Sequence, residues 1–167
     1  MAERTVKFGG RQLAVRGPKL EVGQKAPEFK LVGDDLKEVS LKDTTGKVRI
    51  LATVPSLDTG LCDRETRRFN EEATRLPGVE VLVASMDLPF AQKRWCGAAG
   101  IERVRTLSDH RAATLEAWGV LLPDVRLLAR VVFVLDPGDV VRYVEYLPDA
   151  GQEPDYGAAL AAARKLL

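Results

Sequence analysis

The sequence predicts an α/β fold with a central mixed β-sheet and helices outside it, and two observations carry this prediction. Short apolar runs rich in β-branched residues alternate with amphipathic helical patterns through the middle of the chain. Hairpin signals stand near both ends, at Gly9-Gly10 and at Asp136-Pro137-Gly138-Asp139. Strands joined through helices pair in parallel and hairpin strands pair antiparallel, so the sheet should contain both arrangements.

The N-terminal part is expected to consist of short strands. Residues 6–8 and 13–15 flank the two glycines as a small β-hairpin. Residues 29–32 and 38–41 are further strand candidates, and a polar turn separates them.

The middle of the chain alternates strands and helices. Residues 48–53 form a buried strand interrupted by Arg49, and a helix follows that stops at Pro77-Gly78. Residues 79–84 are a second apolar strand. Pro89 is the expected first residue of a short helix that ends near Gly97, and residues 104–107 are a brief strand.

The C-terminal part is expected to close the sheet with a hairpin and a helix. Ser108 or Asp109 caps a helix that carries Leu115 and Trp118 and stops at Gly119. Residues 130–135 and 140–147 flank the second turn. The last helix begins after Asp155, and one face should hold Tyr156, Leu160, Ala163 and Leu167. Without repeats or long linkers, residues 1–167 are expected to be a single domain, thioredoxin-like in outline.

Composition excludes several classes of function. The 25 basic and 24 acidic residues leave a net charge of +1, which gives no reason to expect nucleic acid or a membrane surface as a partner. The N-terminus has no apolar signal segment, and two cysteines are too few for a secreted disulfide scaffold, so a cytoplasmic protein is expected. His110 is the single histidine, which makes a metal site improbable, and no cofactor is expected.

The turn at residues 54–62 and the helix after it are the strongest chemical signal. With Thr59 as the helix N-cap, Cys62 lies in the first turn, where free N–H groups and the helix dipole favour a thiolate. Helical spacing continues from Cys62 along one buried stripe, formed by Thr66, Phe69, Ala73 and Leu76. Asp63 and Glu65 oppose ionisation of the thiol, so a cation from elsewhere in the chain is needed.

The alternative is that Cys62 is an inert apolar core residue, as most buried free cysteines are. Ionisation alone also supplies little reactivity. A thiol with a pKa near 8.5 is already a few per cent ionised at neutral pH, so full ionisation gains at most about one and a half decades in rate. A fast thiol enzyme must therefore also position its substrate and stabilise charge in the transition state.

Cys96 is the second cysteine, and small residues follow it at Gly97-Ala98-Ala99-Gly100. A bond to Cys62 would close a loop of about 35 residues, worth roughly 3.5–4 kcal/mol on the chain-entropy model. Spacing leaves three readings open: a redox pair, two unrelated thiols, or a structural disulfide. A cytosolic setting disfavours the last.

Two segments resemble a known family. Residues 54–62, Val-Pro-Ser-Leu-Asp-Thr-Gly-Leu-Cys, contain the pattern Pro-x-x-x-Thr-x-x-Cys of the peroxiredoxins. Residues 85–98 resemble the resolving-cysteine segment of their bacterial thiol peroxidase (Tpx) subfamily, of the atypical 2-Cys type. Residues 106–109, 129–134 and 153–156 and the N-terminal hairpin also fit, so the resemblance covers nearly the whole chain.

The resemblance implies a thiol-specific peroxidase of antioxidant defence, which reduces hydrogen peroxide and organic hydroperoxides. By similarity, Cys62 is the peroxidatic thiolate and Cys96 resolves its sulfenic acid as an intramolecular disulfide, which thioredoxin reduces. Pro55 would shield the pocket, Thr59 would hydrogen-bond the thiolate and peroxide, and Arg130 would be the cation that the residues alone could not single out. A homodimer is also implied. Phe90 and the apolar stripe weakly favour organic peroxides.

Two other functions remain to be separated from this one. A redox sensor would react with peroxide but pass the oxidation to a partner protein. A Cys62/His110 hydrolase would need the imidazole within hydrogen-bond reach of the thiol. If both cysteines sit on formed helices, we also expect a local rearrangement before they can bond.

Overall fold

The computed structural model describes residues 4–111 and 115–167. Its large sheet is built from β3 (Lys30–Val32), β4 (Glu38–Ser40), β5 (Val48–Thr53), β6 (Val79–Ser85), β7 (Val104–Ser108), β10 (Val131–Leu135) and β11 (Val141–Tyr146). The helices are α1 (Gly60–Ala73), α2 (Pro89–Ala99) and α3 (Tyr156–Arg164), with 3-10 turns η1 (Leu41–Thr44) and η2 (Leu115–Trp118). Two small hairpins pair β1 (Thr5–Phe8) with β2 (Arg11–Ala14) and β8 (Leu121–Leu122) with β9 (Leu127–Leu128).

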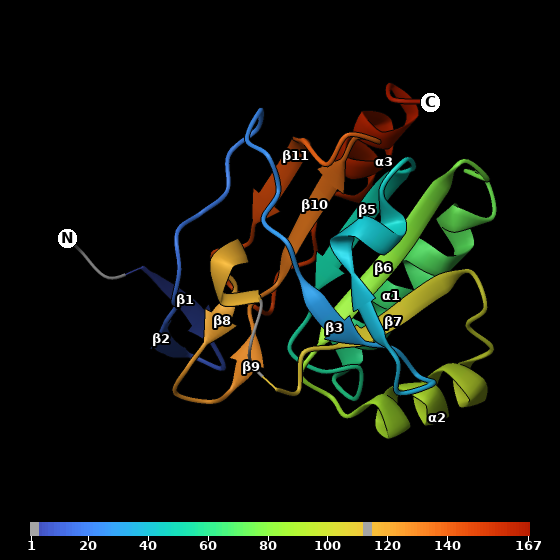
Figure 1. Ribbon diagram of the computed structural model, residues 1–167. Coiled ribbons are helices and arrows are strands. Elements are labelled where there is room, and N and C mark those ends of the chain that lie inside the picture. The colour runs from blue at the N-terminus through green and yellow to red at the C-terminus, as the bar shows by residue number, and fades with distance from the viewer. Residues whose placement is uncertain (1–3, 112–114) are drawn as a thin grey trace.

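The large sheet is mixed, as the sequence predicts. Its strand order is β11–β10–β5–β6–β7–β3–β4 (Figure 1). The central pairs β5–β6 and β6–β7 are parallel, because each connection passes through a helix. Both flanks are antiparallel: β10 pairs with β5 and β11, and β3 pairs with β7 and β4.

The alternation of side chains along the strands divides the core into two layers. Ile50 and Ala52 of β5 face α1 and α3, together with Val132 and Val134 of β10. Leu51, between them, faces the opposite layer, which the N-terminal hairpin and the β8–β9 hairpin help to close. Cys62 belongs to the first of these layers, the one that the helices cover.

Three details differ from the sequence prediction. Helix α2 runs two residues beyond Gly97, and Gly100 ends it in the left-handed conformation (φ 70°). Leu167 is 63% exposed because α3 ends at Arg164, so its predicted place on the buried face is wrong. Where a helix was expected before Gly119, the described residues form the short turn η2. Asp109 accepts a hydrogen bond from the Leu115 amide, and residues 112–114 lie outside the described part.

The remaining predicted elements are present, and two were not foreseen: the 3-10 turn η1, which begins at Leu41 where a strand was expected to end, and the β8–β9 hairpin. Asp155 caps α3 by accepting a hydrogen bond from the Ala158 amide, as expected. The β8–β9 hairpin has two residues per strand, too short to produce a periodic pattern in sequence. Within residues 4–111 and 115–167, none of the helices combines the length and apolar character that crossing a bilayer requires.

Candidate active site

The turn between β5 and α1 is closed by its own side chains. Thr59 is the N-cap of α1: its hydroxyl oxygen accepts a hydrogen bond from the Cys62 amide at 3.3 Å, as the sequence predicts. The same hydroxyl donates to the Ser56 carbonyl at 3.1 Å. Pro55, in the same turn, is buried. These contacts fix the first turn of α1 and hence the position of Cys62.

Cys62 begins the buried face of α1. It is fully buried, and the side chains predicted to share its stripe are all buried as well, namely Thr66, Phe69, Ala73 and Leu76. The buried Thr66 hydroxyl is satisfied within the helix, because it donates its proton to the Cys62 carbonyl at 2.8 Å. The thiol is free.

Arg130 supplies the cation at this thiol. Its Nη2 donates to the sulfur of Cys62 at 3.2 Å, its Nη1 contacts a carboxylate oxygen of Glu65 at 3.3 Å, and its Nε donates to the Ala150 carbonyl at 3.0 Å. The side chain is only 2% exposed. A planar guanidinium held at three points has a fixed direction, so Nη2 is aimed at the sulfur.

The sheet brings Arg130 to this place. It directly precedes β10, and it shares the parity of Val132 and Val134, which face α1. The Thr53 hydroxyl donates to the Ala129 carbonyl at 2.7 Å, which ties the end of β5 to the start of β10. The Ala150 amide in turn donates to the carbonyl of Lys7, so the N-terminal hairpin supports the loop that holds Arg130.

Glu65 is a component of the site that the sequence did not predict as one. It is fully buried, and its second carboxylate oxygen has no hydrogen-bond partner among the described residues. Burial raises the pKa of its carboxyl to about 7, and the attraction of Arg130 only partly opposes this. Near neutral pH part of the population is therefore protonated, which weakens the opposition to a thiolate expected from the sequence. Its position three residues after Cys62, next to the buried stripe, was the available signal.

A cavity of about 240 Å³ opens at the turn. It is lined by Phe8, Gly9, Pro55, Thr59, Leu61, Arg130, Ala150 and Gly151. Pro55, Thr59 and Arg130 thus meet at one opening. Phe90, which the sequence suggested as a hint of substrate preference, is 66% exposed on α2 and is not one of the lining residues. The phenylalanine that lines this cavity is Phe8.

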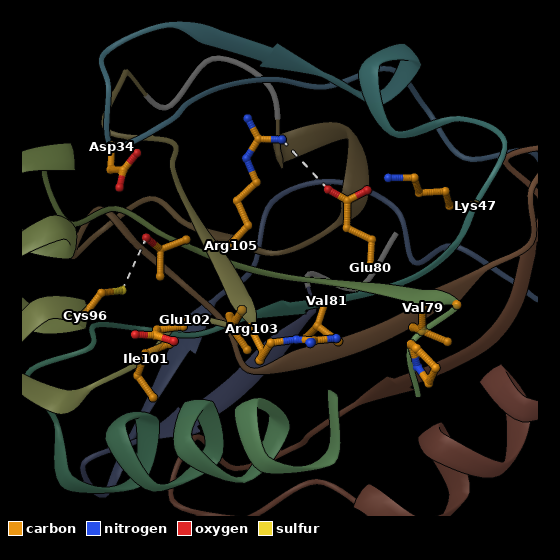
Figure 2. Close-up of a pocket in the computed structure, with 14 residues that line it drawn as sticks. Asp34, Lys47, Val79, Glu80, Val81, Cys96, Ile101, Glu102, Arg103 and Arg105 are labelled. Atoms are coloured by element: carbon orange, nitrogen blue, oxygen red, sulfur yellow. Dashed lines mark hydrogen bonds and ion pairs between the residues drawn. The ribbon is translucent and has the colours of Figure 1, made fainter. Parts of the chain in front are cut away.

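Cys96 lies elsewhere, in the last turns of α2 and on the wall of a different cavity of about 600 Å³ (Figure 2). Its sulfur lies 3.7 Å from the hydroxyl of Thr106 in β7. Burial raises the pKa of this thiol, and the contact with Thr106 opposes the shift. The other lining side chains carry both signs of charge, including Lys47, Arg105 and Glu80.

The structure therefore brings together four of the five predicted site residues: Pro55, Thr59, Cys62 and Arg130. The fifth, Cys96, is a free thiol with a partner of its own. His110 donates its backbone amide to Ser108, and no hydrogen bond joins it to Cys62 within the described chain. The described part of the chain also contains no cluster of three or more histidine, cysteine, aspartate or glutamate side chains suited to a metal ion.

Comparisons with known proteins show which family the chain belongs to. Residues 21–160 match the redoxin family. The thiol peroxidase of Halalkalibacterium halodurans is 51% identical over 98% of this chain and 99% of its own. That of Bacillus subtilis is 50% identical over 100% and 99%. The crystal structure of a peroxiredoxin-like protein from Aquifex aeolicus superposes with a TM-score of 0.92 at 41% identity, covering 98% of both chains.

A free thiol in contact with a guanidinium at the start of a helix, on a thioredoxin-like α/β fold, is an arrangement suited to thiol-dependent redox chemistry. The chain belongs to the redoxin family and, within it, to the thiol peroxidases of the peroxiredoxin class. It is accordingly an oxidoreductase of the peroxiredoxin type.

Proposed function

We propose that Cys62 is the peroxidatic residue of this enzyme. Its thiolate attacks the terminal oxygen of a hydroperoxide, the O–O bond breaks, and the alkoxide leaves as alcohol after taking up a proton. Cys62 is thereby oxidised to a sulfenic acid, and the peroxide is reduced by two electrons. The observation that carries the proposal is the contact of Arg130 Nη2 with the Cys62 sulfur at 3.2 Å.

The residues around the sulfur suit this step. As the O–O bond lengthens, negative charge moves onto the leaving oxygen, and a pre-aimed guanidinium stabilises it. The Thr59 hydroxyl lies at the cavity opening, where it can hydrogen-bond the peroxide. Pro55, buried and at the same opening, is the residue proposed to shield the thiol from water. These contributions supply the part of the rate that ionisation of a thiol alone does not supply.

Cys96 is the proposed resolving residue. Its thiol attacks the sulfenic sulfur of Cys62, water leaves, and an intramolecular disulfide forms. A disulfide requires the two sulfurs to meet at about 2.05 Å. In the reduced protein one sulfur contacts Arg130 and the other contacts Thr106. We therefore expect both cysteine segments to move before the bond forms.

Thioredoxin is the proposed reductant: its dithiol gives two electrons and two protons to the disulfide and becomes a disulfide itself. Hydrogen peroxide and alkyl hydroperoxides are the proposed substrates, because the cavity is small and combines Phe8 and Leu61 with polar groups. A homodimer and a cytoplasmic location complete the proposal, and both are inferred from the resemblance.

The test is a reaction of the reduced protein with one equivalent of hydroperoxide. Both thiols should disappear, and a monomeric disulfide should migrate faster on a non-reducing gel. Cys62→Ser should abolish turnover, whereas Cys96→Ser should stop at the sulfenic acid. If both thiols remain titratable, the proposal fails. Disulfide formation with negligible turnover with thioredoxin would instead favour a redox sensor.

A further inference from the structure

The carboxylate of Asp87 ties the Cys62 turn to the segment that precedes α2. Its Oδ1 accepts a hydrogen bond from the Ser56 hydroxyl at 2.7 Å. Its Oδ2 accepts two more, from the Leu57 amide at 2.9 Å and from the Ser85 hydroxyl at 2.8 Å. Asp87 thus holds the two residues that lead into the helix of Cys62.

The same hydrogen bonds continue into the helix of Cys96. The Ser85 hydroxyl oxygen accepts a hydrogen bond from Gln92 Nε2 at 3.0 Å, and that nitrogen also donates to the Leu107 carbonyl at 2.8 Å. Gln92 is fully buried in α2, and it lies four residues before Cys96, on the same face. An unbroken chain of contacts therefore runs from Ser56 through Asp87 and Ser85 to the turn of α2 beneath Cys96.

The Asp87 backbone is fixed as well. Its carbonyl accepts the hydroxyl proton of Ser108 in β7, and its amide donates to Ser85 at 3.3 Å. Ser85 and Ser108 are both only 1% exposed. The carboxylate cannot follow the Cys62 turn if that turn moves away from the sheet, so the bonds to Ser56 and Leu57 must break.

We propose that Asp87 is a positioning residue that latches both cysteine segments in their reduced arrangement and thereby sets the fate of oxidised Cys62. This inference rests on the proposed roles of Cys62 and Cys96. Closed, the latch keeps the thiolate under Arg130 for attack on peroxide. Open, it lets the sulfenic sulfur leave the site and meet Cys96.

The sulfenic acid has two competing fates. It can lose water to the Cys96 thiol and become a disulfide. It can instead reduce a second hydroperoxide to alcohol and become a sulfinic acid, with the oxygen transferred to sulfur. The first fate needs the latch open and the second needs the closed site. Weakening Asp87 should therefore shift the partition toward the disulfide.

The test compares Asp87→Asn with Asp58→Asn. The first variant replaces one acceptor oxygen of the latch with an amide donor of the same size. The second removes the same charge from an exposed residue of the Cys62 turn. Reduced proteins are mixed with hydrogen peroxide and acid-quenched, and intact-mass spectrometry follows the dithiol, the disulfide and the sulfinic acid over time.

Asp87→Asn should slow the oxidation of Cys62 several-fold but speed disulfide formation by about tenfold or more, the factor expected for losing a hydrogen bond to a charged group. The peroxide concentration that gives half sulfinic acid should rise by at least the same factor, because over-oxidation needs the closed site. Asp58→Asn should change neither step. Opposite changes in the two steps separate a latch from a merely destabilised fold, which would slow oxidation without this selective gain.

An Asp87→Asn protein that forms its disulfide no faster than the wild type overturns the latch, and so does an equal effect of Asp58→Asn. If Asp87→Asn does not fold, Ser56→Ala carries the test: it removes one donor and should shift the partition the same way, by less. An unchanged partition in Ser56→Ala then refutes the latch. A wild-type protein that forms no disulfide with Cys96 refutes the proposed function itself, and the two failures are distinguishable.

Discussion

The guanidinium of Arg130 lies 3.2 Å from the sulfur of Cys62, although 68 residues separate them in the chain. Neither residue reaches the other by local structure. The N-cap of α1 positions the thiol, and the N-terminal end of β10 positions the guanidinium. The reactive group therefore forms only when the central sheet is assembled, which couples activity to the integrity of the β5–β10 pair.

Replacing Arg130 by lysine should lower the rate of Cys62 oxidation by about 10²–10³, the loss typical of removing one pre-aimed donor. An ammonium keeps the charge but cannot contact the sulfur, Glu65 and the Ala150 carbonyl together. Stopped-flow oxidation by hydrogen peroxide measures the effect. The control is Arg142→Lys, in a half-exposed ion pair with Asp136. Equal rates in Arg130→Lys and wild type would contradict the role given to the guanidinium.

Glu65 should make stability depend on pH in a specific window. Its pKa in the folded protein is about 7, above the ordinary value of 4.5, so the folded state binds more protons between these values. The free energy of unfolding should therefore fall as pH rises through that window. Below it the carboxyl is protonated in both states, and its contribution no longer changes.

Glu65→Gln measures this dependence. Urea titrations at several pH values give the free energy of unfolding of both proteins. The value for the wild type minus the value for the variant should decrease as pH rises from about 4.5 to about 7. Glu71→Gln, on the exposed side of the same helix, is the matched control and should show no such change. A flat difference for Glu65→Gln would show that the carboxyl is not buried as described.

Thr59 contributes to both stability and rate, and two variants separate its methyl group from its hydroxyl. Thr59→Val should lose the cap to the Cys62 amide and cost about 1 kcal/mol of stability. Peroxide reactivity should fall by at least about tenfold, because the hydroxyl at the cavity opening is gone. Thr59→Ser should retain most of both properties. Urea unfolding and single-turnover oxidation are the measurements, and a reactive Thr59→Val protein would argue against the hydroxyl.

Trp95 should report the movement of the Cys96 segment. Its half-buried ring lies next to Cys96, and the Arg67 guanidinium sits 5.8 Å from the ring centroid. Trp118, the other tryptophan, is fully buried in the opposite layer of the core. Oxidation should change the intrinsic fluorescence, and Trp95→Phe should remove that change. A full signal in Trp95→Phe would place the rearrangement away from α2.

Sequence patterns predicted most of the fold because its main elements are locally encoded. A run rich in β-branched residues predicts β5, and the capping residues Thr59 and Asp155 predict where α1 and α3 begin. Alternation along β10 could also have shown which face Arg130 occupies. The alternation could not show that Cys62 is the partner of Arg130, because that contact depends on how distant strands pair.

The unforeseen parts depend on contacts between distant segments. Glu65 is an acid on a helix; its place beside the buried stripe indicates burial, but the pattern does not show that Arg130 will be its partner. Asp87 follows a strand in an ordinary loop, and its role depends on Ser56 and Leu57, which approach only in the folded chain. Such pairs are invisible to periodicity, which reports burial but not partners.

The antiparallel register between β5 and β10 sets Thr53 opposite Val131. Because side chains alternate, a slip of a single residue would turn Arg130 toward the other layer and leave Glu65 buried without its cation. The effect of an inserted residue should thus depend strongly on where in the chain it is placed. Extra residues in the connection between β8 and β9 leave the register intact, whereas one residue inserted between Arg130 and Leu135 should remove activity while much of the sheet survives. Selection on insertions and deletions should be strictest along this one strand.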